Sequence, residues 1–418
     1  MTQAEGSGPR AVPLAVLTLV EYYLPGYKAG GPLRTVENMV ARLVGPITFR
    51  IITRDRDCGD ERPYPDLVTG RRYRVGNAEV QYLASRGERP RGLRRAMRET
   101  PHDVLYLNSL FSTHFSLRPL LLRAIGAVPR RPVVVAPRGE LHPGALGLGG
   151  WPRWVPPAVA ERLAGPRALK KRLYIALGRR VGLFRDVVWQ ASNDEEGRHV
   201  RAALGEGARV IVAPDLAPLP DLTPRPRSVT RRKRAGELRV MFLSRIDPKK
   251  NLAAAIAMLR TVRGAVHLDI YGPVEDGGYW ATCQEALRTL PANITSEYRG
   301  ALLHDEVGAA FSSHHLFLFP TLGENFGHVL LESLVNGCPV LTSDRTPWRG
   351  LEAHRAGWDL SLDDHAAFSR AVQRCVDMSA EEFRQWSRGA EALGARQLHD
   401  ESASELNRAL FAAAVRPR

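Results

Sequence analysis

The chain has 418 residues and a formal net charge of +15 at neutral pH. Because single hydrophobic cores stop growing near about 250–300 residues, we expect two domains. Apolar residues make up 44% and charged residues 25% of the sequence, which is ordinary globular usage and excludes a disordered or fibrous chain.

The first half alternates short apolar runs with amphipathic stretches. Continuous Val/Ile/Leu runs are typical of strands buried on both faces of a parallel sheet. The expected strands are Val12–Val20, Thr48–Thr53, Asp103–Leu107 and Pro132–Ala136. Helical spacing is found at Arg34–Leu43 and Leu117–Ile125. This alternation predicts a doubly wound α/β domain over residues 1–218.

A stretch rich in proline and arginine, residues 219–236, interrupts the pattern, and we interpret it as an interdomain linker. A second α/β domain is expected over residues 237–395. Its predicted strands are Val240–Leu243, His267–Tyr271, Leu316–Phe319 and Pro339–Thr342, and its predicted helices are Asn251–Thr261 and His328–Asn336. A helical tail, Ala380–Val415, closes the chain, and we expect its last part, about 396–418, to pack back on the first domain.

The basic charge has three candidate partners: nucleic acid, an anionic membrane surface and phosphorylated substrates. No zinc finger, RNA-binding aromatic motif or basic zipper is present, so nucleic acid is not expected as a partner. An arginine-rich composition that reflects codon usage alone would explain the charge equally simply.

Cysteine spacing and apolar runs indicate the compartment. The four cysteines, Cys58, Cys283, Cys338 and Cys375, form no CxxC pair, which indicates neither a zinc site nor a redox motif. Met1–Arg10 lacks the apolar core of a signal peptide, and no apolar run reaches the roughly 20 residues needed to span a bilayer. We therefore expect a cytoplasmic protein.

The segment Phe319–Leu341 has the strongest functional pattern. It is expected to run from a strand through a loop into a helix, with Glu324 in the loop and Glu332, eight residues later, about one turn inside the helix. A helix N-terminus offers amide donors and a partial positive charge that suit a diphosphate. Carboxylates beside it can accept hydrogen bonds from sugar or ribose hydroxyls. The remaining loop residues expected at the site are Gly323, Asn325, Phe326 and Gly327.

A purely structural explanation is that Glu324 caps the helix and Glu332 lies on its solvated face. The leucines around Glu332 argue against this, because they predict a largely buried helix and an unpaired buried carboxylate is costly.

The same segment resembles the E-x7-E motif of the family-4 retaining glycosyltransferases. The resemblance implies the GT-B fold, with two Rossmann-like domains facing each other across a cleft. It implies that Glu324 lies near the transferred sugar, that Glu332 binds the ribose, and that the amides at 325–327 lie near the donor sugar and phosphates. The first domain would then bind the acceptor and the second the nucleotide sugar.

A second motif, Met241–Leu252, is expected to form a strand, a basic loop and a helix start. Arg245 and Lys250, five residues apart, suit phosphate, since arginine pairs with it in a bidentate manner and lysine supplies a point charge. A solvated basic loop would have the same composition. The segment is similar to the stretch with which the family holds the donor diphosphate, although Ser244 stands where the family usually has glycine.

A glycine-containing turn in the first half also resembles the family. Gly30 and Gly31 lie between an expected strand and helix, as in the family's first glycine-rich loop, which faces the donor phosphates. Such turns are common in unrelated proteins.

The segment Ala136–Leu146 resembles a subset of the family associated with cell-surface polysaccharide assembly. Its candidate acceptor contacts are Arg138, Gly139, Glu140 and His142, although a loop with incidental charges would look the same. His114 matches a family histidine loosely, and we expect it to be a helix residue first.

Together these resemblances imply a retaining, hexosyltransferase-type enzyme with no cofactor beyond its nucleotide-sugar co-substrate. We expect it to be metal-independent, because the sequence has no convincing D-x-D pair of the kind that holds a metal–nucleotide complex. The expected acceptor is a glycan or lipid-linked glycan. The tract Arg86–Arg98 and the apolar residues Trp151, Trp154 and Val155 are expected to contact the inner membrane face. The open alternatives are a soluble small-molecule acceptor, a related epimerase or phosphorylase, and a non-enzymatic nucleotide-sugar binder.

Overall fold

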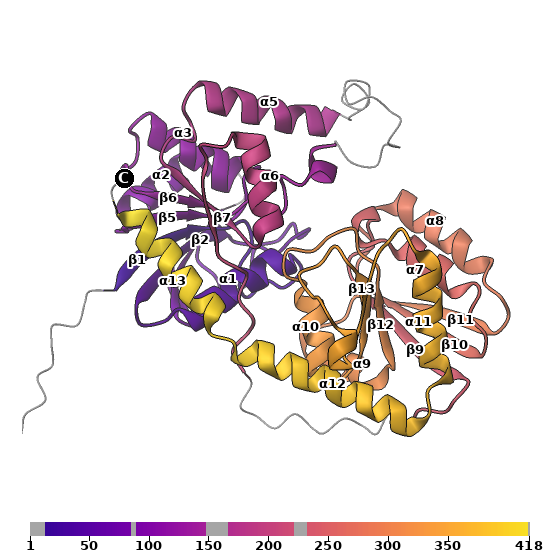
Figure 1. Ribbon diagram of the computed structural model, residues 1–418. Coiled ribbons are helices and arrows are strands. Elements are labelled where there is room, and N and C mark those ends of the chain that lie inside the picture. The colour runs from indigo at the N-terminus through magenta and orange to yellow at the C-terminus, as the bar shows by residue number, and fades with distance from the viewer. Residues whose placement is uncertain (1–12, 85–88, 148–165, 221–231, 417–418) are drawn as a thin grey trace, which may run out of the picture. The chain divides into compact units, whose positions relative to one another are not determined.

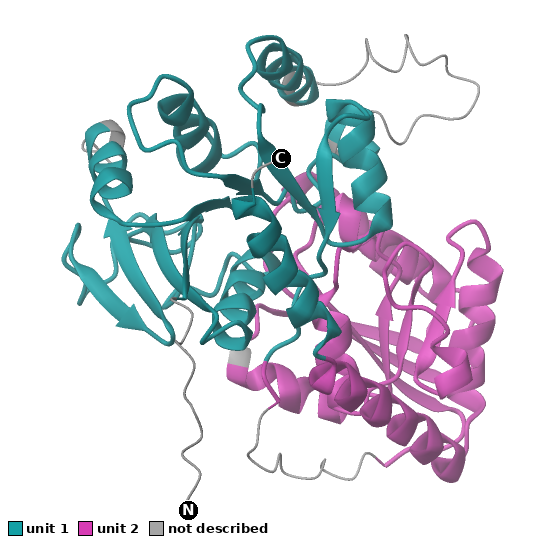
Figure 2. Ribbon diagram, turned by 60° about the vertical axis from the view of Figure 1, so that its left-hand side comes forward, with its two compact units in different colours: residues 1–218, 401–418 teal, residues 219–400 magenta. Residues whose placement is uncertain are grey.

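The computed structural model describes residues 13–84, 89–147, 166–220 and 232–416. The chain divides into two compact units, one of residues 1–218 with 401–418 and the other of residues 219–400 (Figure 2). Each unit contains one largely parallel sheet with helices on its faces, which confirms the predicted α/β class. Trp151, Trp154, Val155 and Arg86 lie outside the described residues.

The first unit is built on an eight-stranded sheet in the order β3-β4-β2-β1-β5-β6-β7-β8. Among the strands of the described residues, only the pair β3–β4 of this sheet is antiparallel. The strands are β1 Leu14–Leu19, β2 Ile47–Arg54, β3 Arg72–Val75, β4 Ala78–Leu83, β5 Val104–Leu107, β6 Val133–Val135, β7 Val187–Ala191 and β8 Arg209–Val212. Four of these match predicted runs, whereas β3, β4, β7 and β8 were not predicted.

Helices cover both faces of this sheet, because the continuous apolar strands offer a buried side chain to each face. Their bounds are α1 Gly31–Arg42, α2 Arg89–Glu99, a π-helix Thr113–Leu117, α3 Arg118–Ala124, a short 3-10 turn Pro143–Leu146, α5 Pro166–Arg180, α6 Asp194–Leu204 and α13 Ser402–Val415. Val16 packs in one cluster with α1 and α13, and its neighbour Leu17 packs in the other with α2, α3, α5 and α6 (Figure 1).

The second unit has a six-stranded, wholly parallel sheet in the order β11-β10-β9-β12-β13-β14. The strands are β9 Glu237–Leu243, β10 Ala265–Tyr271, β11 Ile294–Gly300, β12 Leu316–Phe319, β13 Val340–Ser343 and β14 Gly357–Leu360. The helices are α7 Leu252–Leu259, α8 Gly277–Arg288, α9 His304–Ser313, α10 His328–Val335, α11 His365–Asp377 and α12 Ala380–His399, with 3-10 turns at Pro248–Lys250 and Glu352–His354. The predicted strands and helices here are all present, and β11, β14, α8, α9 and α11 are additional.

The helical tail consists of two helices, not the single one that the sequence predicted. A break at Asp400 and Glu401 separates α12, in the second unit, from α13, in the first. Phe411 of α13 contacts the rings of Phe49 and Tyr106, with centroids 6.2 and 5.4 Å apart, so α13 completes the core of the first unit. On α12, Trp386 stacks on Trp358 at 4.2 Å.

The end of the predicted linker is a fixed part of the second unit. The ammonium of Lys233 is buried and donates hydrogen bonds to the carbonyls of Arg234, Val376 and Met378 at 2.7, 2.9 and 3.0 Å. Burial lowers the pKa of this lysine. Residues 221–231 of the linker lie outside the described residues.

Replacing Lys233 by Met is expected to lower the free energy of unfolding by about 2 kcal/mol, because buried carbonyls lose their donor. Urea unfolding followed by circular dichroism measures this. Arg234→Met is the matched control: its side chain is largely exposed, so a change within about 0.5 kcal/mol is expected. Equal losses in both variants would contradict the structural role of Lys233.

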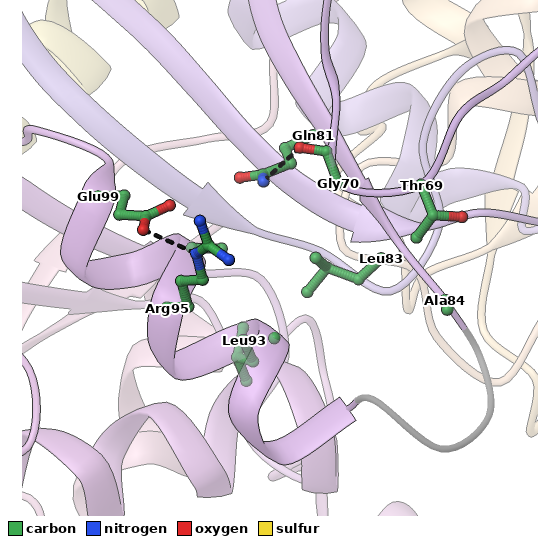
Figure 3. A pocket seen from close by; sticks show the side chains of 10 residues that line it. Thr69, Gly70, Gln81, Leu83, Ala84, Leu93, Arg95 and Glu99 are labelled. Atoms are coloured by element: carbon green, nitrogen blue, oxygen red, sulfur yellow. Dashed lines mark hydrogen bonds and ion pairs between the residues drawn. The ribbon is translucent and has the colours of Figure 1, made fainter.

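The predicted basic tract coincides largely with α2. Its arginines 91, 94, 95 and 98 are exposed, while Leu93, Ala96 and Met97 pack on the sheet. A cavity of about 330 Å³ lies between α2 and β4, with the ion pair Arg95–Glu99 at its edge (Figure 3). No helix of the described residues is both long and apolar enough to cross a membrane.

Candidate active site

The loop that follows β9 contains the predicted phosphate-binding residues. The carboxylate of Asp247 accepts hydrogen bonds from the amides of Lys249 and Lys250 at 2.8 and 3.3 Å, which folds residues 248–250 into a 3-10 turn. Asn251 ends this turn in the left-handed conformation, at φ 62°, which asparagine tolerates better than most residues. Its side chain donates to the carbonyl of Pro320 at 2.9 Å. The loop is thereby fastened to the end of β12.

The loop that follows β12 is fastened to the same place. The amide of Leu322 donates to the carbonyl of Lys249 at 2.8 Å, and the hydroxyl of Thr321 also reaches this carbonyl, at 3.2 Å. The amide of Glu324 donates to the carbonyl of Arg345 at 3.1 Å. Two motifs separated by about 70 residues of sequence therefore form one structural element at the carboxyl ends of neighbouring strands, where ligands bind in open α/β sheets.

Lys250 and Glu324 form an ion pair at this junction. The Nζ of Lys250 lies 2.5 Å from Oε1 of Glu324, and the two side chains are only 12% and 14% exposed. The hydroxyl of Thr321 donates to the same oxygen at 3.2 Å. Burial raises the pKa of Glu324, but the charges of Lys250 and Lys249 and the hydrogen bonds outweigh this and hold the pKa below its usual range. Glu324 is therefore a carboxylate at neutral pH.

Arg245 lies in the same electrostatic cluster. Its NH1 contacts both carboxylate oxygens of Glu275, at 2.8 and 2.9 Å, and the charge of Glu324 also acts on its guanidinium. Its side chain is 45% exposed. Both predicted phosphate ligands are thus paired with carboxylates, and Arg245 is the more accessible of the two.

The segment between Glu324 and α10 is held in a defined shape. Gly327 has φ 78°, and a Cβ there would lie 2.7 Å from Leu330, so glycine is needed. The carbonyl of Phe326 accepts a hydrogen bond from the indole of Trp348 at 2.7 Å. Asn325 is half-buried, and Gly323 precedes Glu324 at the start of the segment. Trp348 is a supporting residue that the sequence did not reveal, because it lies 22 residues away.

Glu332 lies one turn inside α10, as predicted. Its flanking residues Leu331 and Ser333 are buried, but Glu332 itself is half-buried. The fuller burial that its leucine neighbours suggested is therefore wrong for this position, and its carboxylate does not bear the desolvation cost of a deeply buried charge.

Ser244, which stands where the resembling family usually has glycine, makes a close backbone contact with Gly272. The carbonyl oxygen of Ser244 approaches Gly272 so closely that a Cβ at residue 272 would lie 1.9 Å from it. The close backbone contact at the ends of β9 and β10 thus depends on Gly272, and Ser244 itself is half-buried.

In the first unit, Gly30 and Gly31 begin α1. A Cβ at either position would meet no atom within 4 Å, and Gly30 has φ 65°. The loop before them is held by Asp57, whose buried carboxylate accepts hydrogen bonds from the amides of Tyr27 and Lys28 at 2.8 and 3.1 Å. Asp57 is a second supporting residue that sequence reasoning missed.

Arg138 is engaged inside the first unit. Its guanidinium donates to Asn108 at 2.6 Å, to the hydroxyl of Tyr106 at 2.5 Å and to the carboxylate of Asp215. Its side chain is nearly buried, and its backbone has φ 54°. The contacts join the ends of β5, β6 and the segment after β8, so the side chain has a structural task besides any contact with an acceptor.

The residues that follow Arg138 are also tied to neighbouring loops. The amide of Gly139 donates to Glu196 at 2.5 Å, and the carboxylate of Glu140 accepts from the amide of Leu110 at 2.6 Å. Burial raises the pKa of Glu140. His114 lies in the π-helix, so it is a helix residue, as predicted. Its Nδ1 lies 3.2 Å from a guanidinium nitrogen of Arg118.

Two groups of described residues bring potential metal ligands within 4.8 Å of one another. One consists of His142, Glu195 and His199 of the first unit, and the other of His267, Asp269 and Glu297 of the second. In the second group the carboxylate of Asp269 already pairs with two arginines, which makes it a poor cation site. Neither group includes a predicted donor-binding residue.

Comparisons with known proteins agree with this architecture. The model of the family described as glycosyl transferases group 1 matches residues 228–392. Among solved structures, Anabaena HepE in complex with UDP and glucose is 13% identical, with TM-score 0.61 over 96% of this chain and 99% of its own. WaaG, a glycosyltransferase involved in lipopolysaccharide biosynthesis, is 14% identical, with TM-score 0.62 over 94% and 98%.

Sucrose-phosphate synthase from Thermosynechococcus elongatus is 15% identical, with TM-score 0.64 over 96% of this chain and 100% of its own. No curated protein matches the chain by sequence. The solved structures establish the fold, which confirms the GT-B prediction. The family match spans the two motifs around Lys250 and Glu324, so residues 228–392, most of the second unit, are similar to the group 1 glycosyl transferases.

Proposed function

We propose that the chain transfers a sugar from a nucleotide-diphosphate sugar to a hydroxyl of a glycan or lipid-linked acceptor, in cell-surface polysaccharide synthesis. The second unit, residues 219–400, binds the donor, and the first unit binds the acceptor. Donor contacts are assigned to Arg245, Lys250, Glu332 and residues 323–327, with Gly30 and Gly31 at the phosphates. Acceptor contacts are assigned to Gly139, His142 and His114, with Arg138 and Glu140 shaping the loop around them.

The observation that carries this proposal is the ion pair between Lys250 and Glu324. It joins one residue from each donor motif at the carboxyl edge of the sheet, next to the N-terminus of α10. Such a helix end favours anions through its free amides and its dipole. A lysine that already sits against a carboxylate there can hold a diphosphate while the carboxylate faces the sugar.

The proposed reaction needs no covalent enzyme intermediate. The bond between C1 of the donor sugar and the β-phosphate oxygen breaks, and its electron pair stays on the phosphate. The acceptor hydroxyl oxygen bonds to C1 from the same face, and its proton passes to the leaving phosphate oxygen. Arg245 and Lys250 stabilise the charge that develops on the nucleoside diphosphate, without a metal ion. The products are the retained glycoside and the nucleoside diphosphate.

Release of nucleoside diphosphate tests the proposal. UDP-glucose is the first donor to try, since HepE has been crystallised with it, and other nucleotide sugars follow. A true donor should raise the melting temperature by mass action and release nucleotide when acceptor is added. Stabilisation without release would instead identify a non-enzymatic binder, and stabilisation by no nucleotide sugar would contradict the donor site.

Arg245→Ala and Lys250→Ala are each expected to reduce kcat/KM for the donor about ten- to hundredfold, because a charge-assisted hydrogen bond contributes roughly 1.5–3 kcal/mol. Steady-state kinetics at varied donor concentration measure this. Arg288→Ala, which removes an exposed arginine from α8 in the same unit, is the matched control. Near-normal turnover in both site variants would contradict the assignment of Arg245 and Lys250 to the donor diphosphate.

A further inference from the structure

Helix α5 of the first unit carries an apolar stripe on its outer face. Leu169, Leu173 and Leu177 are 60%, 65% and 56% exposed, and Val181, just after the helix, is 63% exposed. Residues four apart lie on one side of a helix, so these side chains form a single row. Exposed leucines are ordinary when they are scattered, but a continuous row marks a site of interaction.

The opposite side of α5 is already occupied by the protein core. Ala168, Ile175 and Gly178 are buried, and Ile175 belongs to the cluster that covers one face of the sheet. Surface helices normally present polar residues outward when one face packs inward. The outward leucines are therefore not part of the core that the described residues of this unit form.

The charged residues of α5 itself are all cationic. Lys170 and Arg180 are exposed on α5, and Arg185 is exposed just beyond it. From Val104 to Arg185 the sequence contains two carboxylates, Glu140 and Glu161. Glu140 is hydrogen-bonded inside the unit. The outer side of α5 is thus apolar and cationic, and the nearest exposed carboxylate that follows it is Asp186.

Other helices on the same face of the sheet also have exposed apolar or cationic side chains. Leu121 of α3 and Ile125, directly after it, are exposed at 44% and 74%. The arginines of α2 at positions 91, 94, 95 and 98 are also exposed. Because α2, α3 and α5 all pack in one cluster on one face of the sheet, their outer sides belong to one layer (Figure 1).

We propose that α5, with the outer sides of α2 and α3, docks the first unit on an anionic lipid bilayer. The row of leucines inserts at the boundary between headgroups and acyl chains, as the apolar face of an interfacial helix does. The lysine and arginines beside it pair with anionic headgroups. A second copy of the chain is a poorer occupant, because two such surfaces would bring like charges together. The inference rests on the proposed function, because docking on the bilayer would bring the first unit to a lipid-linked acceptor.

Co-sedimentation of the full chain with vesicles tests the proposal. Strong binding to equal parts phosphatidylglycerol and phosphatidylcholine is expected, with weak binding to phosphatidylcholine alone and a steep fall as salt rises. Serine at three stripe positions should weaken binding about tenfold or more, since each leucine inserts its apolar area. This variant carries Leu169→Ser, Leu173→Ser and Leu177→Ser. Substitution of these exposed residues leaves the core intact.

A control variant removes three other exposed apolar side chains, which lie outside the layer. It carries Leu303→Ser, Leu406→Ser and Val415→Ser, and it should bind as the wild type does. Lys170→Gln with Arg180→Gln should weaken binding to anionic vesicles only.

Unchanged vesicle binding by the stripe variant would overturn the proposal. A wild-type dimer that the stripe variant turns into a monomer, with vesicle binding unaltered, would assign the stripe to a second copy and overturn it too. Nucleotide release from a soluble donor should be equal in all variants, so failure of membrane docking is distinguishable from failure of the donor assignment.

Discussion

Replacing Asp269 by Asn is expected to lower the free energy of unfolding by about 3 kcal/mol or more, because it breaks a buried ionic cluster. Asp269 is fully buried on β10, in the sheet of the second unit. One carboxylate oxygen lies 2.8 Å from Nε2 of His314 and 3.3 Å from Arg239, and the other contacts Arg299 and His267. An asparagine has the same shape, but its side-chain NH2 group would face the N–H donors of the arginines and histidines around it.

The pH dependence gives this prediction a second observable. Burial raises the pKa of Asp269, but the hydrogen bonds from His314 and Arg299 and the nearby positive charges outweigh it and hold the pKa well below its usual range. A carboxyl whose folded pKa is depressed stabilises the fold fully above its unfolded pKa, near about 4, and loses this as pH falls further. The stability difference between wild type and Asp269→Asn should therefore shrink below about pH 4.

Urea unfolding at pH 7 and at pH 3 measures both effects. Glu285→Gln is the control, since it removes a carboxylate from an exposed ion pair of the same unit and should cost at most about 0.5 kcal/mol. A loss of equal size in the two variants, or a difference that grows as the pH falls, would contradict the role given to Asp269.

The strands that the sequence predicted have a local signal, although the similar buried run of β7, Val187–Ala191, was missed. Runs such as Leu316–Phe319 are buried on both faces and have no polar alternative to a parallel strand. It missed β3 and β4 because an antiparallel hairpin near the edge alternates polar and apolar residues and contains arginines. The break at Asp400 was not predicted, because helical spacing continues on both sides of it. The tertiary contacts of α13 favour two helices, and the sequence does not reveal them.

The site divides in the same way. Glu324, Lys250 and Arg245 could be found because residue type and spacing recur within short motifs. The supporting contacts could not, because Asp57, Trp348 and Asp215 meet these partners 22 to 180 residues away. The pairing of Lys250 with Glu324 is also a product of tertiary structure, since neither motif contains information about the distance to the other.

The two motif glutamates are expected to differ in kinetic effect. Glu324→Gln should lower kcat about a hundredfold or more, because a fixed charge beside the reacting centre is lost where positive charge develops. Its KM should change little, since Lys250 keeps its charge and loses only its carboxylate partner. Glu332→Gln should raise KM for the donor about tenfold and leave kcat nearly unchanged, because ribose contacts are the same in ground and transition states.

A double-mutant cycle separates this assignment from a purely structural one. If the ion pair acts as a unit in catalysis, Lys250→Met, Glu324→Gln and the double variant should give kcat/KM values that are not additive, since residues in direct contact couple. If the glutamates only cap and solvate the helix, each variant should lose about 1 kcal/mol of stability at most and keep its kinetics. Melting curves recorded beside the kinetics distinguish the two cases. Two stable and fully active glutamine variants would refute the donor site, because no step of the proposed transfer would then depend on the carboxylate that Lys250 holds.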